Sequence, residues 1–294
     1  MQRSVRTYLV LLLGVILAWL CLQEENLQAL TGSNGPILLG IAALYLVSHV
    51  LRMIRLGLLT LDERKMAPSL IAAHTLTAFP SSFLPFKIGE VLRLAAFLKV
   101  YDYRRKALAV WMAERFGDLI ILSAFIFGLY LFNVDVPSST KAALAVFVLA
   151  TVIGLMGLFS IAKVSIYLNR HLVLTSHSHR GLVLLRISHM LRGLEQDISR
   201  SVKGRVSGLL LLSVLIWAAE IIALSFFIYR VEPAAHGFAS MFTAGLLANL
   251  PGSGIAESAG YGLLQAFALV ALTLLFLAGI FLVGRLRHLG SQHD

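Results

Sequence analysis

The sequence predicts an all-α integral membrane protein with about six transmembrane helices and two inverted re-entrant helical hairpins. Hydrophobic residues make up 58% of the 294 positions and charged residues 14%, whereas soluble domains carry about 25% charge. The apolar residues form stretches of about 20, the length that spans a bilayer as a helix. Basic residues lie in short clusters between these stretches, as the positive-inside rule predicts. We expect a single polytopic membrane domain over residues 1–294.

The charges that flank the first two spans determine their orientation. Residues 7–22 follow Arg3 and Arg6, and this basic start places the N-terminus in the cytoplasm. The segment resembles a signal peptide but has no convincing small-residue cleavage site, so we expect a retained helix. An acidic loop without basic residues follows, as expected outside. The second span, at about 36–56, returns to a cytoplasmic loop with Arg52, Arg55, Arg64 and Lys65.

Residues 67–99 interrupt this alternation. Their apolar part is too short to cross the bilayer comfortably and is broken around Pro85. Charge of the cytoplasmic type flanks both ends, so the chain enters and leaves on the same side. Such a segment is a re-entrant hairpin, and its broken backbone needs cover from protein or from a water-filled cavity.

The middle of the chain contains three further spans and one basic segment. The third span, at about 107–132, leads out, and the fourth, at about 142–162, returns. The basic segment 163–205 then leads to the fifth span, at about 206–229. It has apolar residues at helical spacing and basic residues on the other face, which is typical of a helix lying on anionic headgroups. An ordinary cytoplasmic connecting helix explains the pattern equally well.

A second broken stretch, 237–261, precedes the sixth span at about 262–284. If Arg285 and Arg287 lie in the cytoplasm, residues 237–261 must enter and leave from outside. The two hairpins then open to opposite faces as an inverted pair, the arrangement in which transporters hold a substrate near the midplane. We expect both termini in the cytoplasm and the protein in a bacterial inner membrane.

Several classes of function are excluded or disfavoured. The net charge of +10 follows the positive-inside pattern, whereas a nucleic-acid reader needs one contiguous basic face. The single cysteine, Cys21, excludes an intramolecular disulfide and a thiolate metal cluster. The histidines are scattered, so we expect surface histidines and no metal site. No Walker loop, zincin pattern, dinucleotide fingerprint or nucleophile elbow occurs. We therefore expect no enzyme activity, no catalytic residue and no cofactor.

The first hairpin carries intramembrane charges, which are costly and mark functional candidates. Pro85 ends a helix and Gly89 relieves the bend, and a helix that restarts there points free N–H groups at an anion. Lys87 and Arg93 add positive charge, and Glu90 lies within reach of an ion pair with Arg93. Alternatively, both cations snorkel to the interface. The candidate headgroup-binding residues here are Ser82, Lys87, Glu90 and Arg93.

A second cluster lies in the third span. Glu114 and Asp118 share a helix face at i,i+4, and Arg115 lies three residues before Asp118. An arginine between two acids offsets part of their charge in a bundle interior. The network either takes part in function or holds the first hairpin through Arg93 or Glu90 as a structural unit. The predicted buried ion network comprises Glu114, Arg115, Asp118 and Glu220 of the fifth span.

The second hairpin contains a Pro-Gly-x-Gly turn with exposed backbone amides. Glu257 follows it in the first turn of a restarted helix, where the helix dipole stabilises a carboxylate. Glu257 therefore either caps this helix or takes part in coupling to a proton or a lipid headgroup. The hairpin backbone residues are Pro251, Gly252 and Gly254, with Pro85 and Gly89 in the first hairpin, and the candidate headgroup-binding residues are Asn249, Ser253 and Glu257.

The motif Pro-Phe-Lys-Ile-Gly-Glu at 85–90, Arg93 and the Glu-Arg-x-x-Asp run at 114–118 resemble the conserved block of the lysylphosphatidylglycerol synthase transmembrane-region family. The Pro-Gly-x-Gly turn before Glu257 is similar to its late motif. The resemblance covers nearly the whole chain and indicates a stand-alone relative of the flippase domain of the multiple peptide resistance factor. The soluble aminoacyl-transferase domain of bifunctional members is not in this sequence, so lysinylation of lipid is not expected. The resemblance implies movement of a lipid or lipid-linked group between leaflets.

We therefore expect a flippase for an anionic phospholipid, a polyprenyl-phosphate carrier or a glycolipid. One alternative is a membrane-embedded polyprenyl-diphosphate phosphatase, whose carboxylates would act as general base or metal ligands. No serine or histidine nucleophile stands beside a basic cluster, which disfavours it. Another alternative is a non-transporting partner subunit of an envelope lipid or glycan enzyme, docking through 163–205. The expected partners are membrane lipids, with a second copy of the chain or an envelope enzyme as further candidates.

Overall fold

A computed structural model describes residues 3–26, 35–83, 88–131, 179–231 and 258–290, with shorter pieces between 145 and 171. These residues are helical and contain no strand, which confirms the predicted all-α class. The predicted fourth span is described only in part, and the second hairpin lies almost wholly outside the described residues. The helices are α1 (Arg3–Leu22), α3 (Gly35–Leu59), η1 (Leu61–Met66, a 3₁₀ helix), α4 (Ala67–Phe83), α5 (Ile88–Val100), α6 (Arg104–Leu131), α8 (His179–Val202), α9 (Val206–Val231) and α11 (Ser258–Gly290).

The described helices make this a multi-pass membrane protein. Four of them, α1, α3, α9 and α11, are long and apolar enough to cross a bilayer. Helix α6 has 28 residues but carries Glu114, Arg115 and Asp118 along its length and is not among the four. Large apolar side chains such as Leu11 on α1 and Leu275 on α11 lie exposed on the outside, as a lipid solvent requires.

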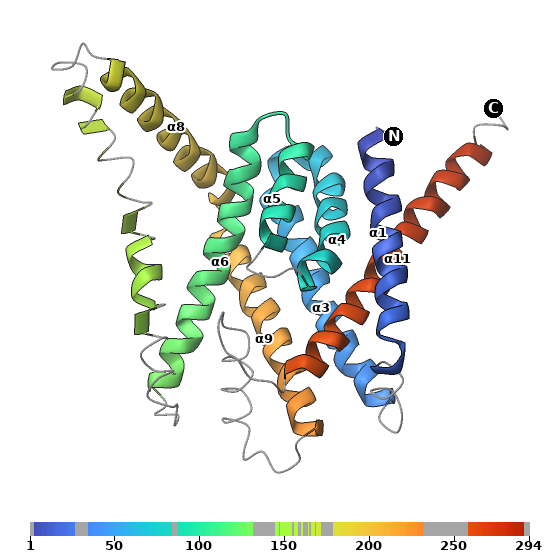
Figure 1. Ribbon diagram of the computed structural model, residues 1–294. Helices are drawn as coiled ribbons and strands as arrows, with labels where there is room; N and C mark the ends of the chain where they lie inside the picture. The colour runs from blue at the N-terminus through green and yellow to red at the C-terminus, as the bar shows by residue number, and fades with distance from the viewer. Residues whose placement is uncertain are drawn as a thin grey trace.

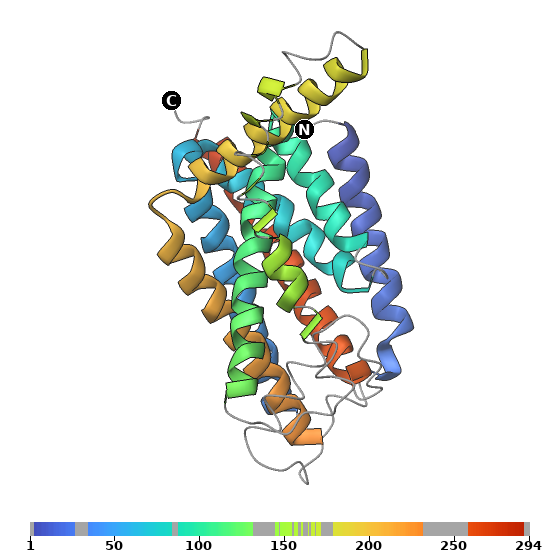
Figure 2. The same cartoon turned by 90° about the vertical axis from the view of Figure 1, so that its left-hand side faces the viewer.

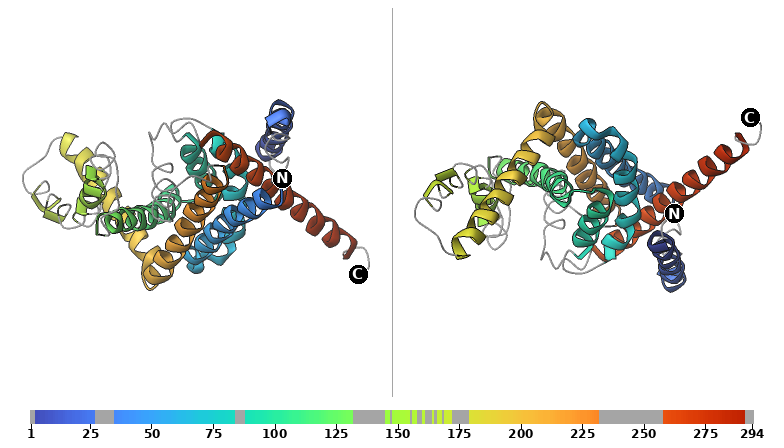
Figure 3. Two further views of the ribbon diagram at one scale, coloured as in Figure 1. Left: turned by 90° about the horizontal axis from the view of Figure 1, so that it is seen from below. Right: turned by 90° about the horizontal axis from the view of Figure 1, so that it is seen from above.

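The helices form one bundle, and several of its features lie together at one end. In Figure 1 the start of α1, the end of α11 and all of α8 lie at the same end, which we call the N-terminal end. Figure 2 shows α6 running beside α9, with α8 lying across their ends. Viewed along the bundle, α8 and the last turns of α11 project to opposite sides (Figure 3). The basic segment 163–205 thus contributes a helix that packs against α6 and extends from the bundle.

Helix α3 is longer than the sequence predicts. It continues to Leu59. Arg52 and Arg55 lie inside this helix, although the charge pattern assigned them to the cytoplasmic loop. Arg55 is 0% exposed. The prediction failed because basic residues at the end of a span are read as loop charge, whereas here carboxylates on α6 and α9 neutralise them.

Helices α4 and α5 form a pair in the segment predicted as the first hairpin. At 1.5 Å per residue they are about 25 Å and about 20 Å long, less than the hydrocarbon core of about 30 Å. In Figure 1 they extend from the N-terminal end only part of the way along α3. Gly89 is the second residue of α5, and the predicted bend around Pro85 lies outside the described residues. An added Cβ at Gly89 would lie 2.5 Å from the Cα of Ser81 on α4, so glycine permits close contact between the two helices. Their placement in a bilayer remains a prediction.

Pro80 creates a defect inside α4 that α1 repairs. Proline has no N–H, so the carbonyl of Leu76, four residues earlier, loses its helical partner. The hydroxyl of Tyr8 donates to this carbonyl at 2.8 Å. The bond ties α1 to α4 and satisfies a backbone acceptor at a depth where water is scarce.

A polar layer separates two apolar clusters in the bundle. Along α3, residues 38–45 contribute to one cluster and Leu56 and Leu59 to the other. Between them, residues 48–55 include buried polar and charged side chains. Helix α9 runs antiparallel beside α3 (Figure 1), and its buried Ser213 and Glu220 again lie between apolar cluster residues. The charged side chains of several helices therefore meet in this layer.

Candidate functional site

Arg55 is the centre of a buried network in this layer. Its Nη1 atom donates to the Asp118 carboxylate at 2.5 Å and to the Ser213 hydroxyl at 2.8 Å. Its Nη2 atom donates to Glu114 at 2.8 Å and to the second oxygen of Asp118 at 3.1 Å. These bonds join α3, α6 and α9. A fully buried guanidinium is stable only with such pairing, so Arg55 holds the three helices in register.

Arg93 connects the α4–α5 pair to the network. Its Nη2 atom contacts both oxygens of Glu114, at 2.6 and 2.5 Å, and its guanidinium lies 5.4 Å from the centre of the Phe97 ring. The predicted pairing of Glu90 with Arg93 is wrong. Both residues lie on α5 within reach of α6, where Glu114 and Arg115 offer a carboxylate to Arg93 and a guanidinium to Glu90.

Glu90 and Arg115 form what we call the network edge, the part of the network most open to the surroundings. Their ion pair measures 3.1 Å, and their side chains are 34% and 24% exposed, respectively. The Trp111 indole N–H donates to Glu90 at 3.4 Å. Arg115 also lies 3.4 Å from Asp118, so the edge is continuous with the buried part of the network.

A second ion pair lies in the same layer, nearer to α9. Arg52 donates to Glu220 at 2.6 Å, and the Ser48 hydroxyl donates to the same carboxylate oxygen at 3.0 Å. Glu220 is buried and faces α3. The sequence alone did not identify Arg52 as its partner, because the two residues are far apart in the chain.

The layer is electrically balanced among the described residues, since four arginines meet four carboxylates. It nevertheless has spare hydrogen-bonding capacity. The buried Nε atoms of all four arginines have no hydrogen-bond partner in the described part of the chain. Guanidinium groups with free N–H donors bind phosphate or carboxylate oxygens well. The carboxylates are Glu90, Glu114, Asp118 and Glu220, and the arginines are Arg52, Arg55, Arg93 and Arg115.

The network contains the residues of the Glu-Arg-x-x-Asp run together with Glu90 and Arg93. Residues 7–286 match the model of the lysylphosphatidylglycerol synthase TM region. The chain belongs to this family. It is thus a membrane protein related to lipid-modifying or flippase proteins. No curated protein and no solved structure matches the chain.

Two histidines are buried beside the arginines of the network. The rings of His49 on α3 and His74 on α4 stack with centroids 5.5 Å apart and planes at 24°. They are 7% and 3% exposed, so the prediction of surface histidines is wrong for both. His189 on α8 is exposed. Their positions in the sequence could have indicated burial, because His49 lies in a predicted span and His74 lies in the apolar half of the predicted first hairpin.

Several of the predicted site residues are not part of the buried network. Ser82 is exposed at the end of α4, and its hydroxyl donates to the Phe79 carbonyl at 2.8 Å. The remaining predicted site residues lie outside the described part of the chain, namely Pro85, Lys87, Asn249, Pro251, Gly252, Ser253, Gly254 and Glu257.

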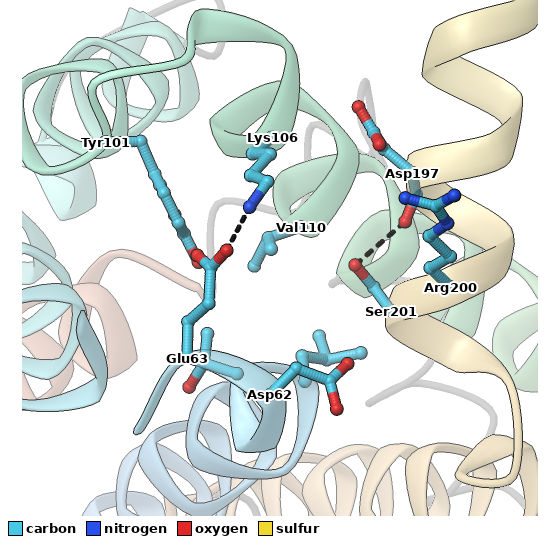
Figure 4. A pocket seen from close by; sticks show the side chains of 10 residues that line it. Asp62, Glu63, Tyr101, Lys106, Val110, Asp197, Arg200 and Ser201 are labelled. Carbon is cyan, nitrogen blue, oxygen red and sulfur yellow. Dashed lines mark hydrogen bonds and ion pairs between the residues drawn. The ribbon is translucent and has the colours of Figure 1, made fainter. Parts of the chain in front are cut away.

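A separate cavity of about 220 Å³ opens at the N-terminal end between η1, α6 and α8. In Figure 4, Lys106 of α6 points to Glu63 of η1, and Tyr101 points toward the same carboxylate. Burial and the nearby Glu63 raise the pKa of Tyr101 to about 12, so its hydroxyl stays protonated. Two further ion pairs, Arg105–Asp197 and Arg205–Asp62, link the surrounding elements. The acidic and basic side chains around this cavity balance one another, which is typical of a structural contact between elements.

Proposed function

We propose that this protein is a lipid flippase of the bacterial inner membrane, which moves an anionic lipid or lipid-linked group between leaflets. The relation to flippase proteins supports this proposal at the level of the family. The observation that carries it is the network edge, where a partly exposed arginine–carboxylate pair continues into a buried, balanced network. Charge of this kind within a membrane bundle marks a substrate or ion path.

The headgroup phosphate would bind by exchange at the network edge. The Glu90–Arg115 pair is partly exposed, and pairs of this kind contribute only about 0–1 kcal/mol. A phosphate that replaces Glu90 on Arg115 gains a charge-assisted hydrogen bond of about 1.5–3 kcal/mol. The free Nε atom of Arg93 lies in the same network and is a second donor. Exchange is therefore easier at this edge than at Arg55, all of whose carboxylate partners are buried.

The buried part of the network would keep the bundle intact during this exchange. Arg55 remains bound to Asp118 and Glu114 while Glu90 leaves Arg115. Glu90 lies on α5, so its release frees the α4–α5 pair from one of its contacts with α6. Movement of this pair against α6 would open the path to one face, as broken helices do in transporters. Lys87 is a sequence-based candidate for a further phosphate contact.

The proposal is tested by lipid exchange in liposomes that contain fluorescent phosphatidylglycerol. We expect protein-dependent exchange that Arg115→Gln slows about tenfold, the equivalent of about 1.5 kcal/mol of lost binding. Arg64→Gln is the matched control, because Arg64 is exposed on η1 outside the network. Absence of exchange by the wild-type protein, or equal rates in both variants, would refute the proposal. Phosphate release from a polyprenyl diphosphate would instead indicate a phosphatase, and activity only with a co-purified subunit would indicate a partner role.

A further inference from the structure

The stacked pair of His49 and His74 lacks the partners that buried polar groups need. Neither ring nitrogen of His74, nor Nδ1 of His49, has a hydrogen-bond partner among the described residues. Both side chains are more than nine-tenths buried. Leaving buried donors and acceptors unpaired costs free energy, so this arrangement points to a ligand that the described part of the chain does not supply.

The surroundings of the pair are strongly polar. Arg52 of one ion-pair system and Arg93 of the other both act on the rings electrostatically. Tyr45 packs edge-on against His49 with centroids 5.1 Å apart. The charged or titratable groups that act on the pair or contact it are Tyr45 and Arg52 from α3, Arg93 from α5 and Glu114 from α6. Glu220 from α9 and Tyr261 from α11 lie near Tyr45, and Tyr8 of α1 lies further along α4.

The chemistry of the pair favours a proton over a metal ion. Among the described residues no group of three His, Cys, Asp or Glu side chains could hold a metal. Two stacked imidazoles can share one positive charge, but a second charge on the pair would be repelled by the first. The two neighbouring arginines also oppose a positive charge on the rings. An anion bound at Arg93 would weaken that opposition.

We propose that His49 and His74 together bind one proton, which they take up when an anionic headgroup binds at the network edge. This proposal rests on the proposed function. It identifies the proton as the ion whose binding is coupled to lipid binding. Coupling between two ligands is reciprocal, so the proton strengthens headgroup binding as much as the headgroup strengthens proton binding. The pair is therefore a ligand site of its own, linked to the network edge through Arg93 and Glu114.

Solid-state NMR of ¹⁵N-histidine-labelled protein tests the proton site without a transport assay. Spectra are recorded between about pH 5 and pH 8 in liposomes of phosphatidylglycerol and of phosphatidylcholine. His49→Gln and His74→Gln assign the signals, and the exposed His189 reports the surface potential. In phosphatidylglycerol we expect the pair to become protonated about one pH unit higher, a tenfold change in proton affinity, beyond the shift of His189. A pair that stays neutral throughout, or that shifts only as much as His189, would overturn the proposal.

Exchange rates as a function of pH separate this proposal from the flippase proposal. We expect the wild-type rate to fall about tenfold between pH 6 and pH 8, as for a single-proton step. His74→Gln is expected to have a flat pH profile, whereas His189→Gln keeps the wild-type profile. A pH-independent wild-type rate would refute proton coupling and leave the flippase intact. No wild-type exchange at all would refute the flippase, and the NMR titration would then decide the proton site alone.

Discussion

Replacement of Arg55 by methionine tests whether the buried network holds the bundle together. The substitution keeps a long apolar side chain and removes the positive charge that pairs with Asp118 and Glu114. Those carboxylates stay buried with one positive charge fewer. Breaking a buried ion pair by removing one partner destabilises proteins by about 3–5 kcal/mol.

The remaining partners place the expected loss at the lower end of this range. Glu114 keeps Arg93 at 2.5 Å, and Asp118 keeps Arg115 at 3.4 Å. Only the Ser213 hydroxyl loses its described charged partner completely. We therefore expect the free energy of unfolding to fall by about 3 kcal/mol, which is about a hundredfold change in the unfolding equilibrium.

Reversible unfolding in detergent micelles measures this change. The matched control is Arg64→Met, which removes an arginine that is exposed on η1 and is expected to change stability by about 0.5 kcal/mol or less. Adding Asp118→Asn to Arg55→Met restores the balance of charge, and we expect it to recover about 1 kcal/mol. Equal stability of Arg55→Met and Arg64→Met, or a further loss on adding Asp118→Asn, would refute the structural role of the network.

Two further predictions concern the α4–α5 pair. Tyr8→Phe leaves the Leu76 carbonyl without its donor and is expected to cost about 1 kcal/mol of unfolding free energy, measured in the same assay; this loss should vanish in a Pro80→Ala background, where the helix supplies an N–H. Gly89→Ala places a Cβ against the backbone of Ser81 and is expected to cost about 1–3 kcal/mol, whereas Gly193→Ala meets only the flexible end of Arg105 and should cost less. A reversed order for the two glycines would contradict the tight packing of α4 on α5.

The hydropathy and charge pattern predicted the helices well, because a span is a local property of about 20 residues. The segments that became α1, α3, α9 and α11 were recognised within a few residues at each end. The acids of the third span were also recognised, because a carboxylate inside an apolar stretch needs a partner. The identity of that partner was not predictable from local spacing. Arg55 reaches Glu114 and Asp118 only because α3 and α6 pack together.

Rules based on local sequence also failed where one pattern has two structural explanations. Basic residues near the end of a span usually belong to the cytoplasmic loop, so Arg52 and Arg55 were assigned there. Both lie inside α3, where carboxylates of α9 and α6 neutralise them. Gly89 likewise suggested a bend, since glycine permits unusual backbone angles. Its role in helix contact became visible only once Ser81 was placed beside it.

The most direct test of the network edge is photo-crosslinking with a phosphatidylglycerol analogue that carries a diazirine on its headgroup. The protein is illuminated in liposomes, and the crosslinked peptides are mapped by mass spectrometry. We predict crosslinks to α5 and α6 near Glu90 and Arg115, with a large loss in Arg115→Gln and none in Arg64→Gln. Crosslinks confined to the lipid-facing sides of α1 and α11, and unchanged in Arg115→Gln, would contradict the assignment of the network edge as the headgroup site.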